Sequence, residues 1–152
     1  MNKFFEISKK SSVSNARLGT INTSHGKINT PAFIFCGTKA TVKSILPQQL
    51  YSTNTQVILS NTYHLMLQPG PEIIAKEGGL QSFTQWNGPM MTDSGGYQIF
   101  SLGHGSVSQE IKGRNNNIQK KSLIKITEEG ATFRNYLNGD KVYLSPEKSI
   151  DL

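Results

Sequence analysis

The chain has 152 residues, of which 16 are lysine or arginine and ten are aspartate or glutamate, so its formal net charge is +6. This length suits a single core. No apolar run approaches the roughly 20 residues of a membrane-spanning helix, and the first residues lack a signal-peptide pattern. We therefore expect a cytoplasmic protein with no membrane partner. The charge fits an anionic partner, such as ribosomal RNA or tRNA, although soluble basic proteins without such a partner are commoner. The single cysteine excludes an internal disulfide or a Cys-x-x-Cys metal site.

The N-terminal part predicts a β-hairpin. Two short strand-like segments, 18–21 and 27–29, flank the turn Ser24-His25-Gly26. The continuous apolar run 31–36 follows, and it predicts a strand that is buried on both faces. Cys36 would then be a small buried hydrophobe at the end of this strand, in preference to a reactive thiol.

The middle of the chain predicts alternating strands and helices. A short helix is expected over 47–51, a buried strand over 56–59, a helix over 71–76 and a further short buried strand over 88–91. Strands ending near residues 36, 59 and 91 give units of roughly 25 to 30 residues, which indicate an α/β protein with a parallel sheet or barrel. Such folds place sites at the carboxyl ends of their strands, so Asn61 and Asp93 are expected to be neighbours. For His64 a packing role is favoured over metal ligation.

The third strand is followed by Thr92-Asp93-Ser94-Gly95-Gly96-Tyr97-Gln98. Two glycines allow a sharp turn through which a ligand can approach the backbone closely. The Asp93 carboxylate can accept hydrogen bonds from the N–H groups of a planar heterocycle while Tyr97 stacks on its face. The alternative is that Asp93 or Ser94 only caps the next helix and the glycines form an ordinary tight turn.

The C-terminal third changes character. Residues 103–122 are rich in glycine, asparagine and basic side chains, and they predict a mobile basic surface loop, for which a solvated insertion is favoured over contact with nucleic acid. Strands are expected over 124–127, 131–137 and 141–144, the last two joined at Asn138-Gly139. Ser145-Pro146-Glu147 predicts a helix start. The sequence stops soon afterwards, so we expect residues 1–152 to form a single partial domain.

Five segments, in this order, resemble motifs of the tRNA-guanine transglycosylase family, also called queuine tRNA-ribosyltransferase: Thr30-Pro31-Ala32-Phe33, Asn61-Thr62-Tyr63-His64-Leu65, Thr92 to Gln98, Lys125 to Gly130, and Leu144-Ser145-Pro146-Glu147. The resemblance implies the N-terminal portion of an irregular (β/α)8 TIM barrel with an N-terminal β-hairpin or sheet. It also implies exchange of guanine at the tRNA wobble position for 7-aminomethyl-7-deazaguanine, in queuosine biosynthesis. The family reaction passes through a covalent enzyme–tRNA intermediate formed by an aspartate.

Residue roles follow from the resemblance by position only. Asp93 matches the aspartate that binds the base and accepts a proton, and Ser94, Gly95 and Gly96 complete that substrate-binding stretch. Tyr97 matches the aromatic that stacks on the base, and Asn61 matches a residue near the ribose and the nucleophile. The family's nucleophile and zinc ligands lie in segments beyond Leu152. We therefore expect no metal or cofactor in this chain, no activity from it alone, and a homodimer only for the full-length enzyme.

The sequence departs from the family pattern at Cys36 and Ser60, where a small apolar residue and a glycine are expected. Two other functions remain open. The chain could be a truncated, non-catalytic fragment or an interaction subunit of the same fold. It could also be a basic RNA-binding module, for which only the net charge and the 103–122 loop argue.

Overall fold

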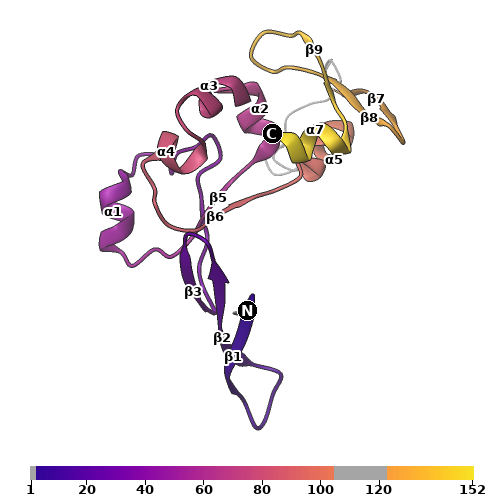
Figure 1. The fold of residues 1–152 in the computed structure, drawn as a ribbon. Helices are drawn as coiled ribbons and strands as arrows, with labels where there is room; N and C mark the ends of the chain where they lie inside the picture. Colours follow the sequence, from indigo (N-terminus) through magenta and orange to yellow (C-terminus); the bar gives the residue numbers. More distant parts are fainter. Residues whose placement is uncertain (1–2, 105–122) are drawn as a thin grey trace, which may run out of the picture.

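A computed structural model describes residues 3–104 and 123–152 of the chain (Figure 1). The described residues form three sheets of three strands each, with short helices between them. These sheets and helices confirm the predicted α/β class. Most of the predicted basic loop, 105–122, lies outside the described residues, and Gly103 and His104 belong to helix α5. None of the described helices is long and apolar enough to cross a bilayer.

The first sheet is antiparallel, in the order β1 (Phe5–Lys10), β2 (Arg17–Thr23) and β3 (Gly26–Thr30). The predicted hairpin is confirmed, because Thr23 pairs with Gly26 across the turn at Ser24 and His25. β1 pairs with β2 and extends the hairpin into the N-terminal sheet that the resemblance implies. This sheet lies at the amino ends of the central strands, where the side chain of Gln56 bonds both backbone groups of Asn29, at 2.8 and 3.3 Å.

The central sheet is parallel, in the order β4 (Phe35–Cys36), β5 (Ile58–Ser60) and β6 (Met90–Thr92). Helix α1 (Pro47–Ser52) connects β4 to β5. Three helices connect β5 to β6: α2 (Thr62–Leu67), α3 (Pro71–Lys76) and α4 (Leu80–Thr84). Helix α5 (Gly96–His104) follows β6. The predicted alternation of strands and helices around a parallel sheet is therefore confirmed. The predicted burial of the strand before Asp93 was wrong, because Met91 and Thr92 of β6 are exposed.

The prediction of a strand over 31–36, buried on both faces, was wrong. Only Phe35 and Cys36 form a strand, the Phe33 side chain is 74% exposed, and Cys36 is an exposed free cysteine. Among the described strands β4 has a neighbour, β5, on one side only, and Pro31 has no N–H to offer a ladder. The continuous apolar run signalled burial that the edge position does not provide.

The third sheet is antiparallel, in the order β7 (Leu123–Thr127), β8 (Gly130–Arg134) and β9 (Lys141–Leu144). The predicted strand over 131–137 ends at Arg134, and residues 135–140 form the connection in which Gly139 has a φ of +81°. Helix α7 (Pro146–Asp151) begins as predicted, because Ser145 Oγ accepts a hydrogen bond from the Lys148 N–H at 3.1 Å.

The core consists of three apolar clusters. The first packs α1 on the parallel sheet through Val42, Leu50, Ile58 and Trp86. The second joins α2 and α3 through Ala40, Leu65 and Ile74. The third joins α2 to the third sheet through Tyr63, Phe133 and Leu144. Because α2 follows the carboxyl end of β5, this last cluster places the third sheet at the end of the parallel strands opposite to the first sheet (Figure 1).

Candidate functional site

Asp93 and Asn61 meet at the carboxyl ends of two neighbouring parallel strands. Asp93 follows β6, Asn61 follows β5, and Asn61 Nδ2 donates to Asp93 Oδ2 at 2.6 Å. The predicted proximity of the two side chains is confirmed, and the cause is the pairing of β5 with β6. Both side chains are half-buried, so the pair lies at the boundary between the protein interior and solvent.

The Asp93 carboxylate also holds backbone. Its Oδ1 accepts from the Thr62 N–H at 2.9 Å and from the Gly95 N–H at 3.3 Å, and the Thr62 hydroxyl donates to the Asp93 carbonyl oxygen. The alternative that Asp93 caps the next helix was wrong for α5, because the helix whose first residue Asp93 bonds is α2. Ser94 does bond the start of α5, because its Oγ accepts from the N–H of Gly96, the first residue of that helix, at 3.3 Å. Each carboxylate oxygen has two lone pairs, so Oδ1 is filled and Oδ2 retains one acceptor position.

The turn after Asp93 requires glycine. Gly95 has a φ of +74°, which L side chains rarely adopt, and a Cβ at this position would lie 3.2 Å from Tyr63 Cβ and 3.4 Å from Leu144 Cδ2. Gly95 therefore lets the β6–α5 connection pass against α2 and β9. This close approach brings the Gly95 N–H to the Asp93 carboxylate.

Tyr97 and Ser94 project differently from Asp93. The Tyr97 side chain, in the first turn of α5, is 68% exposed, which leaves its ring free to accept a planar partner. Ser94 is tied to α7, because its carbonyl accepts from Ser149 Oγ at 2.6 Å. Ser94 and Gly96 line an apolar cavity of about 410 Å³ between α5, α7 and the third sheet, and Asp93 does not line it. The predicted binding stretch thus divides between two surfaces.

Ser60 occupies the position where the resemblance expects glycine. Its side chain is fully buried, and its hydroxyl donates to the Gly37 carbonyl at 2.8 Å. Gly37 in turn donates its N–H to the Leu59 carbonyl at 2.6 Å. The hydroxyl therefore fastens the chain just after β4 to the end of β5, beside Asn61.

Three residues that the sequence did not group form a further cluster beside Asp93. We call it the Lys39–His64–Tyr136 cluster. His64 Nδ1 lies 3.5 Å from Tyr136 Oη, and Lys39 Nζ lies 5.2 Å from the centroid of the Tyr136 ring. His64 packs as predicted, with its ring edge-on to Tyr63. The rule that polar residues gather after parallel strands would have found Lys39, three residues beyond β4, but no sequence signal pointed to Tyr136.

Burial and charge set the pKa of His64. Burial lowers the pKa of the imidazole below its ordinary value of 6.5, the Lys39 ammonium lowers it further, and the Asp93 carboxylate raises it. Burial, with a contribution from Tyr136, raises the pKa of the Tyr63 phenol to about 12. The buried Tyr63 Oη has no hydrogen-bond partner among the described residues.

The described part of the chain brings together no group of three or more histidine, cysteine, aspartate or glutamate side chains that could hold a metal ion. These residues therefore do not fit the zinc ion that the resemblance associates with the full-length family.

Comparison with known proteins gives consistent matches. A family model described as queuine tRNA-ribosyltransferase matches residues 11–152. A queuine tRNA-ribosyltransferase of Protochlamydia amoebophila is 49% identical over 146 residues, which are 96% of this chain and 38% of the relative. The Roseiflexus sp. protein of that name is 44% identical, over 97% of this chain and 37% of its own length. A Staphylococcus aureus protein of that name is 47% identical, over 97% and 34%. The chain thus spans little more than a third of these relatives.

Proposed function

The chain belongs to the queuine tRNA-ribosyltransferase family, and we propose that it supplies the base-binding part of an enzyme that exchanges guanine at the tRNA wobble position for 7-aminomethyl-7-deazaguanine. The observation that carries this proposal is the Asp93–Asn61 pair, in which a half-buried carboxylate stands at the carboxyl end of a parallel strand, four residues before the exposed ring of Tyr97. Queuosine biosynthesis is the pathway in which such an exchange takes place.

Asp93 is proposed to read the base. The edge of guanine presents two neighbouring N–H groups, and a carboxylate with both oxygens available can accept both. In the structure Oδ2 has one acceptor position left while Oδ1 bonds Thr62 and Gly95. Binding would then fill Oδ2 first and exchange one backbone contact of Oδ1 for the base, with Tyr97 stacked on the ring.

Asn61 is proposed to orient this carboxylate. Its amide N–H bonds Oδ2 and so sets the plane of the carboxyl group that faces the base. Ser94, Gly95 and Gly96 shape the turn that carries Asp93, as the φ of Gly95 and the Ser94–Ser149 hydrogen bond indicate. In this proposal Asp93 binds the base and accepts a proton, and the residue that attacks the ribose is not assigned within 1–152.

Further parts of the proposal concern the whole protein. We propose that the parallel sheet of β4, β5 and β6 forms one part of a (β/α)8 barrel, which the first sheet covers at the amino ends of the strands. Its partners would be tRNA and guanine or a 7-deazaguanine base, in an enzyme that is a homodimer at full length. The 152-residue chain by itself is expected to bind the base without transferring it.

The test is binding of tritiated guanine to the chain by equilibrium dialysis. Asp93→Asn should weaken binding by roughly ten-fold or more, because a charge-assisted hydrogen bond to the base contributes about 1.5–3 kcal/mol. Asp151→Asn, at the end of the exposed helix α7, is the matched control and should bind as the parent does. Equal affinity of the Asp93→Asn variant and the parent would remove Asp93 from base recognition.

A non-catalytic subunit of the same fold is the second candidate, and the observation that favours it is that Asp93 Oδ1 is engaged by the backbone N–H groups of Thr62 and Gly95. It differs from the first in the guanine-binding measurement, because Asp93→Asn should then leave guanine affinity unchanged. Both candidates expect the chain alone to form no covalent adduct with tRNA. Incubation of the chain with tRNA, followed by denaturing electrophoresis, should show no covalent adduct if the chain binds without chemistry. An adduct would identify a nucleophile within 1–152 and contradict both candidates on this point.

A further inference from the structure

The Lys39–His64–Tyr136 cluster gathers three parts of the chain at the edge of the Asp93 site. Lys39 follows β4, His64 lies on α2, and Tyr136 belongs to the connection between β8 and β9. All three stand on the side of the molecule where the parallel strands end, as Asp93 does. The roles proposed above for Asp93, Asn61 and Tyr97 do not use any of them.

Two contacts hold the Lys39 ammonium in place and leave N–H donors available for a ligand. Its ammonium donates to Gln68 Oε1 at 3.1 Å and lies over the Tyr136 ring. An ammonium has three N–H donors, and the structure records a partner for one of them. The aromatic face and the amide oxygen therefore fix the position of a positive charge whose remaining donors are available to an anion.

His64 presents a second donor to the same place. Its Nδ1 lies at hydrogen-bond distance from the Tyr136 phenol, at 3.5 Å. If the phenol donates, the neutral ring carries its proton on Nε2 and offers that N–H to a ligand. Burial and the Lys39 charge both favour this neutral form, since both lower the pKa of His64.

The charge pattern indicates which ligand belongs here. Asp93 also acts on His64, so the carboxylate and the Lys39 ammonium lie within electrostatic reach of one imidazole. An RNA nucleotide whose base is bound at a carboxylate brings its own phosphates toward that negative charge. A fixed ammonium that acts on the same imidazole as the carboxylate offsets this repulsion and neutralises a phosphate.

We propose that the Lys39–His64–Tyr136 cluster binds a phosphodiester group of the RNA that presents its base to Asp93. Lys39 supplies the positive charge, His64 supplies a directed N–H, and Tyr136 positions both from the β8–β9 connection. This inference rests on the proposed function, because the RNA is the one whose base Asp93 binds.

The experiment measures binding of a fluorescently labelled tRNA anticodon stem-loop to the chain by anisotropy, over a series of salt concentrations. Lys39→Met keeps an aliphatic side chain against the Tyr136 ring and removes the charge. The slope of log affinity against log salt should fall by about one with this variant, and affinity at low salt should fall several-fold. Lys76→Met, in the exposed last turn of α3, is the matched control and should leave the slope unchanged.

Two more variants test the roles of the neighbours. His64→Gln removes the imidazole and Tyr136→Phe removes only the hydroxyl, and both should weaken RNA binding while the salt slope stays that of the parent. A slope for Lys39→Met equal to that of Lys76→Met would overturn the proposal. A failure of the parent chain to bind the stem-loop would also overturn it. Thermal melting gives the folded fraction of each variant, and a loss of affinity that this fraction fully accounts for would overturn the proposal as well.

The outcomes separate this inference from the proposed function. If guanine binding depends on Asp93 but the salt slope is insensitive to Lys39, the phosphate site is wrong and base recognition stands. If the slope depends on Lys39 while guanine binding ignores Asp93, the phosphate contact stands, and the chain is a basic RNA-binding module.

Discussion

The first and third sheets have the same architecture and different surroundings. Both are antiparallel arrangements of three consecutive strands. In the first sheet only Gly19 and Ile28 are buried, whereas the third sheet buries Ala131, Phe133 and Leu144, the last two against Tyr63 of α2. The first sheet therefore buries one apolar side chain, Ile28, and is hydrogen-bonded to Gln56, whereas the third sheet shares an apolar cluster with α2 behind the candidate site.

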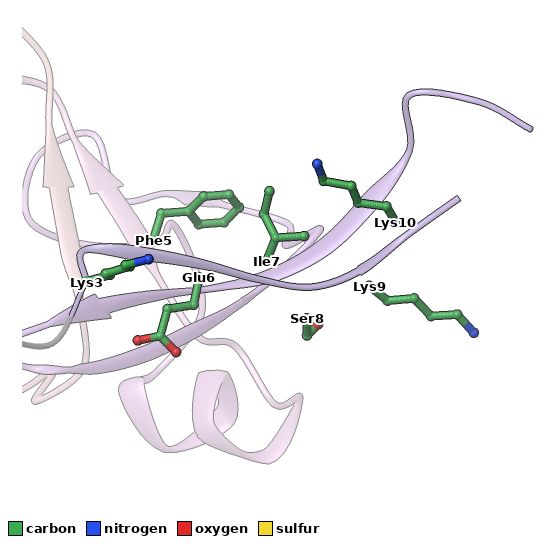
Figure 2. Close-up of a pocket in the computed structure, with 7 residues that line it drawn as sticks. All are labelled: Lys3, Phe5, Glu6, Ile7, Ser8, Lys9 and Lys10. Atoms are coloured by element: carbon green, nitrogen blue, oxygen red, sulfur yellow. The ribbon is translucent and has the colours of Figure 1, made fainter. Parts of the chain in front are cut away.

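Strand β1 is an edge strand of the first sheet, and its side chains disfavour pairing with a further strand. The pairing of β1 with β2 shifts register between Ile7 and Lys9, so a bulge interrupts the alternation of side chains. Figure 2 shows Lys9 on the side of Glu6 and Ser8, and Lys10 on the side of Phe5 and Ile7, around a hollow along the strand. With a lysine on each side of its end, this edge strand is poorly suited to pairing with another chain. The same strand order therefore occurs in the first sheet, at the periphery of the molecule, and in the third sheet, which packs against α2 at the candidate site.

The strongest test of this contrast is Phe133→Ala. The Phe133 side chain has no exposed surface, so its truncation should lower the free energy of unfolding by about 3–5 kcal/mol and disturb Tyr63 and the Gly95 turn. Phe4→Ala, beside the first sheet, removes a ring that is 71% exposed and is the control, with an expected effect below about 0.5 kcal/mol. Urea unfolding measures both. Similar losses would mean that the two sheets contribute equally.

Gly95→Ala should have the next largest effect. A φ of +74° costs an alanine about 1–2 kcal/mol, and its Cβ would press on Tyr63. Gly139→Ala is a matched control, because Gly139 has a φ of +81° but nothing within 4 Å of an added Cβ. The excess destabilisation of Gly95→Ala over Gly139→Ala therefore isolates the contact between the turn and α2. Equal destabilisation by the two substitutions would show that the β6–α5 turn can move away from α2 without a loss of stability.

Gln56→Ala should have a smaller effect, confined to the first sheet. The variant loses two hydrogen bonds to Asn29, with an expected cost of about 1–2 kcal/mol and unchanged guanine affinity. Gln56→Glu can still accept from the Asn29 N–H but cannot donate to its carbonyl, so it should lose part of this amount. Gln48→Ala, exposed on α1, serves as the control. Weaker guanine binding in Gln56→Ala would link the first sheet to the site after all.

The smallest expected effect is electrostatic, at the side of the site that the third sheet covers. NMR titration should give His64 a pKa below 6.5, which Lys39→Met raises and Asp93→Asn lowers further. The folded state binds fewer protons here than the unfolded state. The contribution of the neutral His64 side chain to the free energy of unfolding is therefore complete above pH 6.5 and is lost as the pH falls below that value. His64→Gln should remove this part of the pH dependence, and a shift of the wrong sign in either charge variant would contradict the assigned neighbours.

Local chemistry in the sequence accounts for most elements. The hairpin at Ser24 and His25, the helix cap at Ser145 and the parallel strand ending at Thr92 were predicted from turn residues, capping residues and apolar runs. The proximity of Asn61 and Asp93 also followed, because parallel strands in sequence order bring their carboxyl ends to one edge. These signals suffice because each depends on residues close in the chain or on a general rule of topology.

Other features were decided by tertiary contacts. The exposure of Cys36 depends on β4 being the edge strand, and Oδ1 of Asp93 is occupied because α2 begins beside it. Tyr136 reaches His64 from 72 positions away, through a sheet whose packing on α2 no local pattern encodes. The sequence by itself determined which side chains end which strands. Only the folded chain decided what stands opposite them, because pairing between distant segments is set by the packing of whole sheets and helices and not by short-range preference.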